Sequence, residues 1–439
     1  MTIYNNIFNK LLSNGYEVYY IGGYVRDLLL NKKSKDRDIV TNATPEQIKK
    51  IFPEANLVGK SFGVTLIDNI EVATYRKDRY FGLNDKDVKI TYAETLKEDV
   101  DRRDLTINAL AMDINGVILD YHNGLDDLKN KTIRFIGNPI ERIIEDPNRI
   151  IRAIRFFTVL NDFSISSNTL TALYKARDLV PYIAKERIQK ELINTLKNAR
   201  KSSDFFILAY KLEILHYIFP FMDICYGFNQ NNPHHKEDLF DHLMMVGDKI
   251  SCRYPLLKLA GYLHDIGKLF TKIPKEDKYV YYNHEEVSID LIEEELKELK
   301  FSSDDIKYIC NAVSVHMINF PSDSKKAFRR VLKKLFDRGL VYKDFVRLRL
   351  ADYSGRRGIH DSTPLSDFKK GLYDIKNCET TVIKNPRDLA INGFDIMKLL
   401  NLKPSKEVGN IINKLMDLVI DNPEVNNKEY LTNYIKGEI

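Results

Sequence analysis

The pattern of apolar and polar positions changes near residue 140 of the chain. Before that point, short apolar runs such as residues 18–21 have the length of buried strands. Gly22-Gly23 follows this run and predicts a turn into a helix that begins near Tyr24. From about residue 141, apolar residues recur with helical spacing. The pattern therefore predicts an α+β fold, with a mixed head followed by helices.

A hairpin is predicted within the head. The apolar runs 64–67 and 70–75 are separated by Asp68-Asn69, where we expect the chain to turn. Glu71 lies on the second of the two predicted strands, near the pair of aspartates described next. An isolated glutamate on a strand is common on protein surfaces. Glu71 is therefore a candidate active-site residue only because it lies near these aspartates.

The turn at Gly22-Gly23 has the composition of a phosphate site. The two glycines let backbone N–H groups approach a phosphate closely, and Arg26 adds a fixed positive charge. Asp36 and Asp38 alternate on the next predicted strand, so both carboxylates project to one face. Two such carboxylates repel each other unless a cation lies between them, and Mg²⁺ prefers oxygen ligands and substrate phosphates. The alternative is a solvated turn, because Asp-x-Asp alone is common.

A stripe of charged residues marks the first helical segment. Asp146, Arg149, Arg152 and Arg155 recur at steps of three, which predicts one shared helix face. Three arginines on one face repel each other, so we expect an anion such as a nucleotide opposite them. Asp146 can accept from the exocyclic amine that cytosine and adenine share, and Arg149 can donate to the adjacent ring nitrogen. The alternative is an exposed charged face that pairs with acids elsewhere.

Charge and cysteine content narrow the class of protein. The 439 residues carry a net charge of +5, and many basic residues gather between positions 325 and 357. This cluster suits a nucleic-acid backbone, although a solvated helix surface is the alternative. The four cysteines form no C-x-x-C pair, which is typical of thiols in a reducing compartment. We find no signal-peptide pattern and no apolar run of membrane-spanning length, and expect a cytoplasmic protein without a membrane partner.

A second candidate site lies in the later half of the chain. His242, His264-Asp265 and Asp352 follow the H…HD…D order of metal-dependent phosphohydrolase (HD) domains. Imidazoles and carboxylates form a mixed nitrogen and oxygen site that suits Mn²⁺, Fe²⁺ or Ni²⁺. His284 and His316 are candidates for a second metal ion. The alternative is that the domain is retained as a scaffold without hydrolytic activity.

Several segments, in this order along the chain, resemble motifs of the class II tRNA nucleotidyltransferases, a family that includes CCA-adding enzymes and bacterial poly(A) polymerases. They are GGYVRD at 22–27, KDRDIVT at 35–41, RRDLTINAL at 102–110, EDPNRIIRAIRF at 145–156 and ERIQKE at 186–191. The last motif is expected to brace the helix of the charged stripe. The segment 77–95 departs from the family, because it lacks the usual Asp-x-Arg-x-Pro core.

The resemblance implies a division into four parts. They are a polymerase-beta-like nucleotidyltransferase head with a small mixed sheet (1–140), an all-α neck with a nucleobase-recognition helix (141–215), an HD-type body (225–360) and a helical tRNA-binding tail (361–439). Asp36 and Asp38 would hold two Mg²⁺ ions, with Glu71 as the third active-site carboxylate. The triphosphate would be held by Gly23, Arg26, Arg103, Arg152 and Arg155.

The resemblance further implies template-independent addition of CMP, CMP and AMP to the 3′ end of tRNA, with CTP and ATP as donors and pyrophosphate as product. Three alternatives remain open. One is a poly(A) polymerase of the same family, and another is a partial enzyme that adds only CC or only A. The third, from a different class, is an HD phosphodiesterase whose head merely binds RNA.

Overall fold

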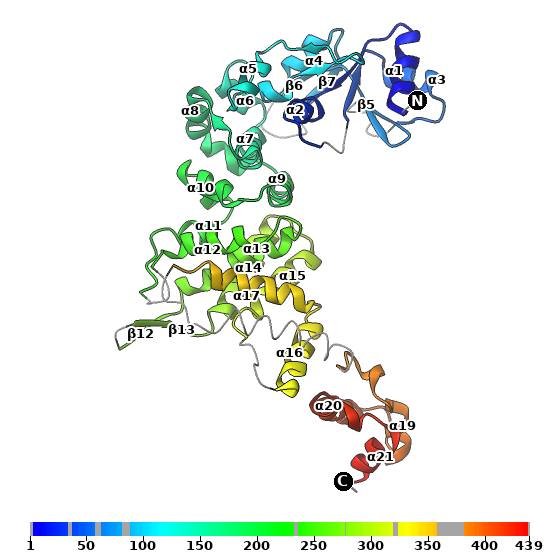
Figure 1. Cartoon of the computed structure of the whole chain (residues 1–439), viewed down its shortest axis with the longest axis vertical. Coiled ribbons are helices and arrows are strands. Elements are labelled where there is room, and N and C mark those ends of the chain that lie inside the picture. Colours follow the sequence, from blue (N-terminus) through cyan, green and yellow to red (C-terminus); the bar gives the residue numbers. More distant parts are fainter. Residues whose placement is uncertain are drawn as a thin grey trace. The chain divides into compact units, whose positions relative to one another are not determined.

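The computed structural model describes residues 3–33, 37–57, 63–80, 88–231, 236–276, 278–318, 324–357 and 382–437. The chain forms two compact units, Met1–Phe219 and Pro220–Ile439 (Figure 1). The predicted head and neck together make up the first unit, and the predicted body and tail make up the second. The four-part division is finer than this and stays a prediction.

The first unit is built around a mixed sheet of seven strands. In spatial order these are β3 (Asn56–Leu57), β4 (Val64–Ile67), β5 (Ile70–Thr74), β2 (Ile39–Thr41), β1 (Val18–Ile21), β8 (Ala111–Met112) and β9 (Ile118–Leu119). The pair β2 and β5 is parallel, and the other neighbouring strands are antiparallel. The predicted small mixed sheet is confirmed.

Two local predictions in the head are confirmed. Strand β1 ends at Ile21, and Gly22, with φ 72° and ψ −128°, leads from it into helix α2 (Gly23–Leu29). Strands β4 and β5 form a hairpin whose turn residues, Asp68 and Asn69, have φ of 49° and 65°. Two successive positive φ values match the twist of antiparallel strands, and Asp and Asn tolerate them better than most residues do.

The remaining elements of the head surround this sheet. They are α1 (Ile3–Ser13), α3 (Pro45–Ile51), α4 (Leu96–Asp101), α5 (Gly124–Lys129) and a separate ribbon of β6 (Arg76–Tyr80) and β7 (Val88–Tyr92). A buried core joins β1, β2 and α4, with Ile21, Val40 and Val100 among its members. The described residues of the segment 77–95, which departs from the family, therefore lie mostly on the ribbon, and residues 81–87 lie outside the described part of the chain.

The neck consists of helices that continue from the head. They are α6 (Pro139–Glu145), α7 (Asn148–Leu160), α8 (Ser167–Lys175), α9 (Lys185–Asn198) and α10 (Ser203–Lys211). Helix α7 buries Ile150, Ile151 and Ile154 and packs against α9.

Asp146 is not part of helix α7, so its predicted place on the same helix face as Arg149 is wrong. Asp146 caps the end of α6 in an extended conformation, with φ −146° and ψ 98°. Pro147 follows it, and a proline disfavours helical backbone at the preceding residue. The three arginines lie on α7 as predicted.

The second unit is mainly helical. Its helices are α11 (Pro220–Asp223), α12 (Leu239–Lys249), α13 (Pro255–Leu263), α14 (His284–Glu298), α15 (Ser303–Ser314), α16 (Lys325–Asp337), α17 (Tyr342–Ser354), α19 (Gly393–Leu400), α20 (Lys406–Asp421) and α21 (Lys428–Lys436). A hairpin of β12 (Lys272–Lys275) and β13 (Lys278–Tyr281) interrupts them and was not predicted. Helices α19, α20 and α21 share a core of their own that includes Ile396, Leu415 and Leu431.

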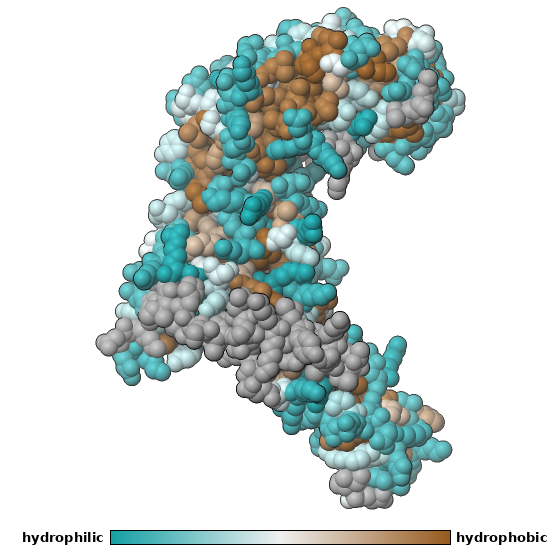
Figure 2. Space-filling model, viewed as in Figure 1, coloured by the Kyte–Doolittle hydropathy of each residue, from teal (hydrophilic) through white to brown (hydrophobic). Residues whose placement is uncertain are grey.

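The surface carries both polar and apolar areas. Figure 2 shows hydrophobic residues gathered on the visible face of the first unit, over the region of α5 and α6. Leu125 of α5 and Ile144 of α6 are among the exposed large hydrophobic side chains. Within the described residues, none of the helices is long and apolar enough to cross a membrane.

Candidate functional site

A cavity of about 550 Å³ lies in the first unit, where the turn after β1 faces the neck helices. Its described lining holds more basic than acidic side chains, as expected of a site for a polyanion. The lining residues are Gly22, Gly23, Arg26, Asp38, Arg76, Asp78, Arg102, Arg103, Asp104, Asn108, Asp146, Asn148, Arg149, Arg152, Arg155, Phe156, Arg187, Lys190 and Glu191. Every residue predicted to bind nucleotide thus lines this one cavity.

The floor of the cavity requires glycine at position 22. The positive φ of Gly22 is unfavourable for other residues, and a Cβ atom there would lie 3.1 Å from Nη1 of Arg103. Arg103 is held by Asp99, whose carboxylate lies 3.2 Å from its Nη2. Burial opposes the ionisation of Asp99, but the adjacent Arg103 and Arg102 lower its pKa below the ordinary value.

Arg26 is fixed in place by two contacts. Its Nη1 donates to Oδ1 of Asn108 at 2.6 Å, and its Nη2 lies 2.7 Å from the carboxylate of Asp27. The guanidinium also lies 5.1 Å from the ring centre of Phe156 on α7. A positive charge held in this way needs little reorganisation when an anion binds.

The arginines of α7 pair with acids from other elements, as the alternative interpretation of the stripe expected. Nη2 of Arg152 lies 2.7 Å from Asp104, and Arg155 pairs with Glu191 of α9. Burial opposes the ionisation of Asp104, but Arg152 lowers its pKa well below the usual range. Both arginines nevertheless line the cavity. The acids therefore orient the guanidinium groups and leave them accessible to a ligand in the cavity.

Asp146 and Arg149 lie at the same cavity although they come from different elements. Oδ2 of Asp146 accepts a hydrogen bond of 2.8 Å from Arg187 of α9. Buried Arg149 donates to Oε2 of Glu145 at 2.6 Å and to the carbonyl oxygen of Arg102 at 3.0 Å. The ERIQKE motif was expected only to brace the neck helix, and its Arg187 does hold Asp146. The structure also places Arg187 on the cavity wall, which the sequence did not indicate.

Of the candidate carboxylates for Mg²⁺, the structure describes Asp38 and Glu71, and Asp38 lies just before a strand and not on one as predicted. Asp38 directly precedes β2, and Ile39 stands opposite Val72 of parallel β5, which brings Asp38 beside Glu71. Both residues line a second cavity of about 490 Å³, and Asp38 also lines the first. Asp36 lies outside the described residues. Two adjacent carboxylates beside a basic cavity offer the oxygen donors that Mg²⁺ prefers, so the described residues fit this ion.

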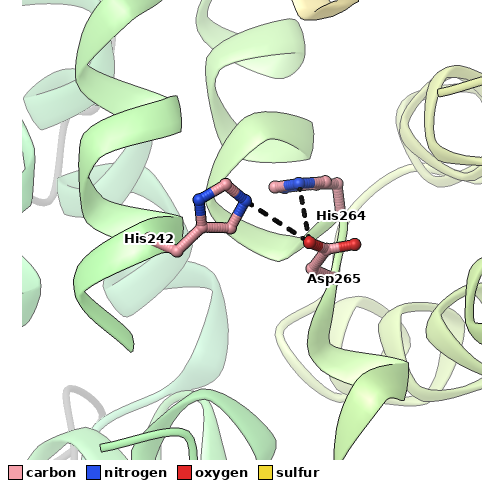
Figure 3. A group of neighbouring side chains, drawn as sticks. All are labelled: His242, His264 and Asp265. Atoms are coloured by element: carbon pink, nitrogen blue, oxygen red, sulfur yellow. Dashed lines mark ion pairs between the residues drawn. The ribbon is translucent and has the colours of Figure 1, made fainter. Parts of the chain in front are cut away.

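The predicted HD residues come together inside the second unit. Figure 3 shows His242 of α12 and His264, at the end of α13, both directed at one oxygen of Asp265. The Nε2 atoms of His242 and His264 lie 3.4 and 3.2 Å from Oδ2 of Asp265. They lie 3.5 and 3.8 Å from Oδ1 of Asp352 on α17. All four side chains are buried, and their donor atoms suit a divalent transition metal.

The carboxylates of this cluster favour positive charge. Burial alone would lower the pKa of His242, but hydrogen bonds with Asp265, Asp352 and Glu237 raise it to about 10. Lys268 lies 2.7 Å from Asp265, and Arg356 lies 2.8 Å from Asp352. Each of these carboxylates therefore has both a basic partner and imidazoles beside it, and Lys268 contacts the same oxygen of Asp265 as His242 and His264 do.

Part of the basic cluster between positions 325 and 357 holds the second unit together. Arg329 of α16 donates to the carbonyl oxygens of Ile420 and Asp421 at 2.6 Å. Lys326 and Arg330 both pair with the side chain of Asp421. These residues are therefore not all available to a nucleic-acid backbone, because α16 uses some of them to attach helix α20.

Four family models match the chain. The Poly A polymerase head domain matches residues 18–134, and the probable RNA and SrmB-binding site of polymerase A matches residues 162–225. The HD domain matches residues 239–343, and the putative domain 2 of tRNA nucleotidyltransferases matches residues 370–435. The models follow the order of the predicted parts.

Similar proteins include CCA-adding enzymes. The enzyme of Oceanobacillus iheyensis is 44% identical over 190 residues, which make up 42% of this chain and 47% of that enzyme. The enzyme of Ligilactobacillus salivarius is 29% identical over 433 residues, which make up 97% of this chain and 93% of that enzyme. The chain thus spans about half of the first relative and nearly all of the second.

Solved structures with the same fold include two CCA-adding enzymes. That of Bacillus stearothermophilus, in complex with CTP, has a TM-score of 0.72 and 23% identity, with 99% of this chain and 96% of that chain covered. That of Thermotoga maritima, complexed with tRNA_CCA, has a TM-score of 0.56 and 19% identity, with 99% and 94% covered. At these identities the likeness shows the fold.

Proposed function

Because the chain belongs to the family of class II tRNA nucleotidyltransferases and poly(A) polymerases, we propose that it is a CCA-adding enzyme. It transfers CMP, CMP and AMP from CTP and ATP to the 3′ end of tRNA without a nucleic-acid template, and releases pyrophosphate. We assign this reaction to the cytoplasm. The observation that carries the proposal is the cavity in which the Gly22-Gly23 turn meets Asp146 and Arg149.

The basic residues of the cavity bind and orient the triphosphate. Gly23 allows close approach of the phosphates to the backbone at the start of α2. Arg26, Arg103 and Arg152 are each fixed by an acid or amide, so their charges are already arranged before the nucleotide binds. The triphosphate is held in line with the RNA 3′ end. The entropy cost of bringing the two reactants together is therefore met on binding, which lowers the free-energy barrier to transfer.

Nucleotidyl transfer in this family depends on a divalent cation, and we propose Mg²⁺. Asp36, Asp38 and Glu71 are the residues that would hold it. When bound, Mg²⁺ lowers the pKa of the RNA 3′-hydroxyl and offsets the negative charge of the triphosphate. Asp38 is suited to this role because it lies between the cavity of the phosphates and the cavity lined by Glu71.

Asp146 and Arg149 select the base. Cytosine and adenine share an amine donor beside a ring-nitrogen acceptor, whereas uracil and guanine reverse this order. A carboxylate that accepts and a guanidinium that donates therefore match the first pair. Uracil or guanine would leave buried polar groups without partners, which costs about 1–3 kcal/mol for each group.

The test is incubation of the purified protein with tRNA that lacks its terminal CCA. With CTP alone we expect two added nucleotides, and with CTP and ATP together we expect three. Addition of only CC, or of only A to tRNA ending in CC, would show a partial enzyme. Long tracts of A from ATP alone would show a poly(A) polymerase.

A second candidate function is metal-dependent hydrolysis of phosphate esters by the second unit. The observation that favours it is the buried convergence of His242, His264, Asp265 and Asp352. We propose Mn²⁺, Ni²⁺ or Fe²⁺ as the ion and 2′,3′-cyclic phosphate ends as substrate. His264→Ala should abolish this hydrolysis and leave nucleotide addition unchanged. If the wild type hydrolyses no such ester with any of these ions or Mg²⁺, the domain is a scaffold.

A further inference from the structure

The second cavity of the first unit, of about 490 Å³, shares Asp38 with the cavity that was described first. No other residue is common to the described linings of the two cavities. The side chains of Asp38 and Glu71 are both exposed. The two cavities therefore meet at a carboxylate that the proposed transfer reaction uses.

The two cavities differ in charge. Arginine is the most frequent residue in the described lining of the first. The second cavity is lined by the carboxylates of Asp38, Asp68 and Glu71, and Arg37 is the one basic residue in its described lining. A triphosphate therefore fits the first cavity better than the second. The second suits a ligand that offers hydroxyl donors to the carboxylates and one phosphate to the arginine.

Arg37 is held by tyrosines from three elements. Its guanidinium carbon lies 4.6 Å from the ring centre of Tyr4 on α1 and 5.2 Å from that of Tyr24 on α2. Burial raises the pKa of Tyr20 on β1, against a hydrogen bond with Arg37. Aromatic rings orient a guanidinium without neutralising its charge, so Arg37 is fixed in place and remains able to bind an anion.

The transfer reaction requires a place for a second substrate beside the triphosphate. The oxygen of the RNA 3′-hydroxyl forms a bond to the α-phosphorus, the bond from that phosphorus to pyrophosphate breaks, and the hydroxyl proton passes to water. The attacking and leaving oxygens lie roughly in line, on opposite sides of the phosphorus. Because the arginines of the first cavity hold the leaving group, the RNA end has to reach Asp38 by another path. The described lining of the second cavity includes Asp38 and none of these arginines.

We propose that the second cavity binds the 3′-terminal nucleotide of the acceptor RNA. Arg37 binds the phosphate of this nucleotide, and Asp68 accepts hydrogen bonds from its ribose hydroxyls. Tyr4 offers a flat ring on which the unpaired base stacks. The proposal rests on the transferase function proposed above, because it gives the second substrate of that reaction its place.

Steady-state kinetics on the full chain test the two contacts. Arg37→Ala and Tyr4→Ala should each raise KM for tRNA that lacks CCA by about tenfold, the scale of one phosphate contact or one stacked base. The affinity for CTP in the absence of tRNA, measured by equilibrium dialysis, should not change. Lys10→Ala removes a positive charge from an exposed position of α1 outside the described lining, and is the matched control. Tyr4→Phe keeps the ring and should retain the wild-type KM.

The kinetic pattern separates RNA binding from a structural role. A lower kcat for Arg37→Ala with an unchanged KM for tRNA would show that Arg37 acts only through the adjacent Asp38, and would overturn the proposal. An equal loss of affinity for CTP and tRNA would overturn it as well. Circular dichroism reports whether each variant is folded.

Photocross-linking locates the RNA end without requiring activity. A tRNA that lacks CCA and ends in 4-thiouridine is irradiated with the wild-type protein, and the linked peptide is identified by mass spectrometry. We expect the link in the peptide that contains Tyr4, unaffected by an α,β-methylene analogue of CTP, which cannot be transferred. A link elsewhere, no link, or displacement by the analogue would overturn the proposal. A link at Tyr4 in a protein that adds no nucleotide would support the RNA site and disprove the transferase function.

Discussion

The carboxylate of Asp146 lies 2.8 Å from the guanidinium of Arg187, a residue 41 positions later in the chain. Asp146 lies outside helix α7, which carries Arg149. The orientation of its carboxylate is therefore held by Arg187 and by the backbone N–H of Asn148. The orientation of Asp146, one of the two residues proposed to select the base, is thus set by a residue of α9. Base discrimination should consequently depend on residues that do not themselves match the base.

Asp146→Ala and Arg149→Ala should weaken the selection of CTP and ATP over UTP and GTP. Each change removes one of the two groups that match the base edge, and each match is worth about 1–3 kcal/mol, or about 5- to 150-fold in kcat/KM ratios. The measurement is kcat/KM for all four nucleotides. Lys175→Ala, at an exposed position of α8, is the control. Unchanged ratios in both variants would place base selection elsewhere.

Arg187→Ala tests whether Asp146 is positioned by its partner. We expect the same loss of discrimination as in Asp146→Ala but smaller, together with a rise in KM for CTP. Arg187→Lys keeps one donor for the carboxylate and should restore part of the selectivity. A variant that loses rate equally for all four nucleotides, without a change in their ratios, would show that Arg187 does not position Asp146.

Asp38→Ala should abolish nucleotide addition while the protein stays folded, and the same is expected for Asp36→Ala. Loss of a metal ligand removes several kcal/mol of transition-state stabilisation, or about 10³-fold or more in rate. The assay uses radiolabelled CTP and ATP at saturating Mg²⁺. Glu46→Ala, in the exposed first turn of α3, removes an acid of the same unit and should be active. Substantial turnover by Asp38→Ala would contradict the proposed role.

Gly22→Ala should impair nucleotide binding beyond its effect on stability. Alanine at a positive φ destabilises the protein by about 1–2 kcal/mol, and its Cβ would also displace Arg103. Gly116 has φ 87° with no neighbour within 4 Å of its Cβ direction, so Gly116→Ala carries the backbone effect alone. We expect a lower Tm for both variants but a higher KM for CTP only in Gly22→Ala. Equal KM values would show that Arg103 can move without consequence.

The stability of the second unit should depend on the ionisation of Glu295. Burial raises the pKa of this glutamate from 4.5 to about 8, against a hydrogen bond of 2.8 Å from the backbone N–H of Phe221. The folded protein therefore holds this proton more tightly than the unfolded chain does. Stability from this group is complete below pH 4.5 and falls as the pH rises to about 8.

Glu295→Gln removes this dependence. A tenfold difference in proton affinity between the folded and unfolded states corresponds to about 1.4 kcal/mol, so the variant should exceed the wild type by a few kcal/mol at high pH. The measurement is the difference in Tm between the two proteins across the pH range. Glu286→Gln changes an exposed glutamate in the first turn of the same helix and should follow the wild type. Parallel Tm profiles for wild type and Glu295→Gln would contradict the prediction.

The local features of the site could be predicted from the sequence, and its distant pairings could not. The Gly22 turn and the Asp68-Asn69 hairpin are set by residues next to each other in the chain, so composition identified both. The break between helices α6 and α7 could also have been predicted from Pro147. It was missed because the regular spacing of the charged residues suggested one continuous helix. Arg155 is paired with Glu191, which lies 36 positions away, and spacing along one helix does not reveal such a partner.

The contacts between head and neck residues bear on recombination between relatives. The carbonyl oxygen of Arg102 accepts from Arg149, and Asp104 pairs with Arg152, so the cavity depends on contacts between residues on either side of residue 140. In a hybrid of two relatives joined at residue 140, the two members of each pair would come from different parents. The contacts would form only where both parents have compatible residues at these positions. A crossover at 219–220 separates the two compact units and leaves these pairs intact. The nucleotide site is thus best exchanged between relatives as a single block of about 219 residues.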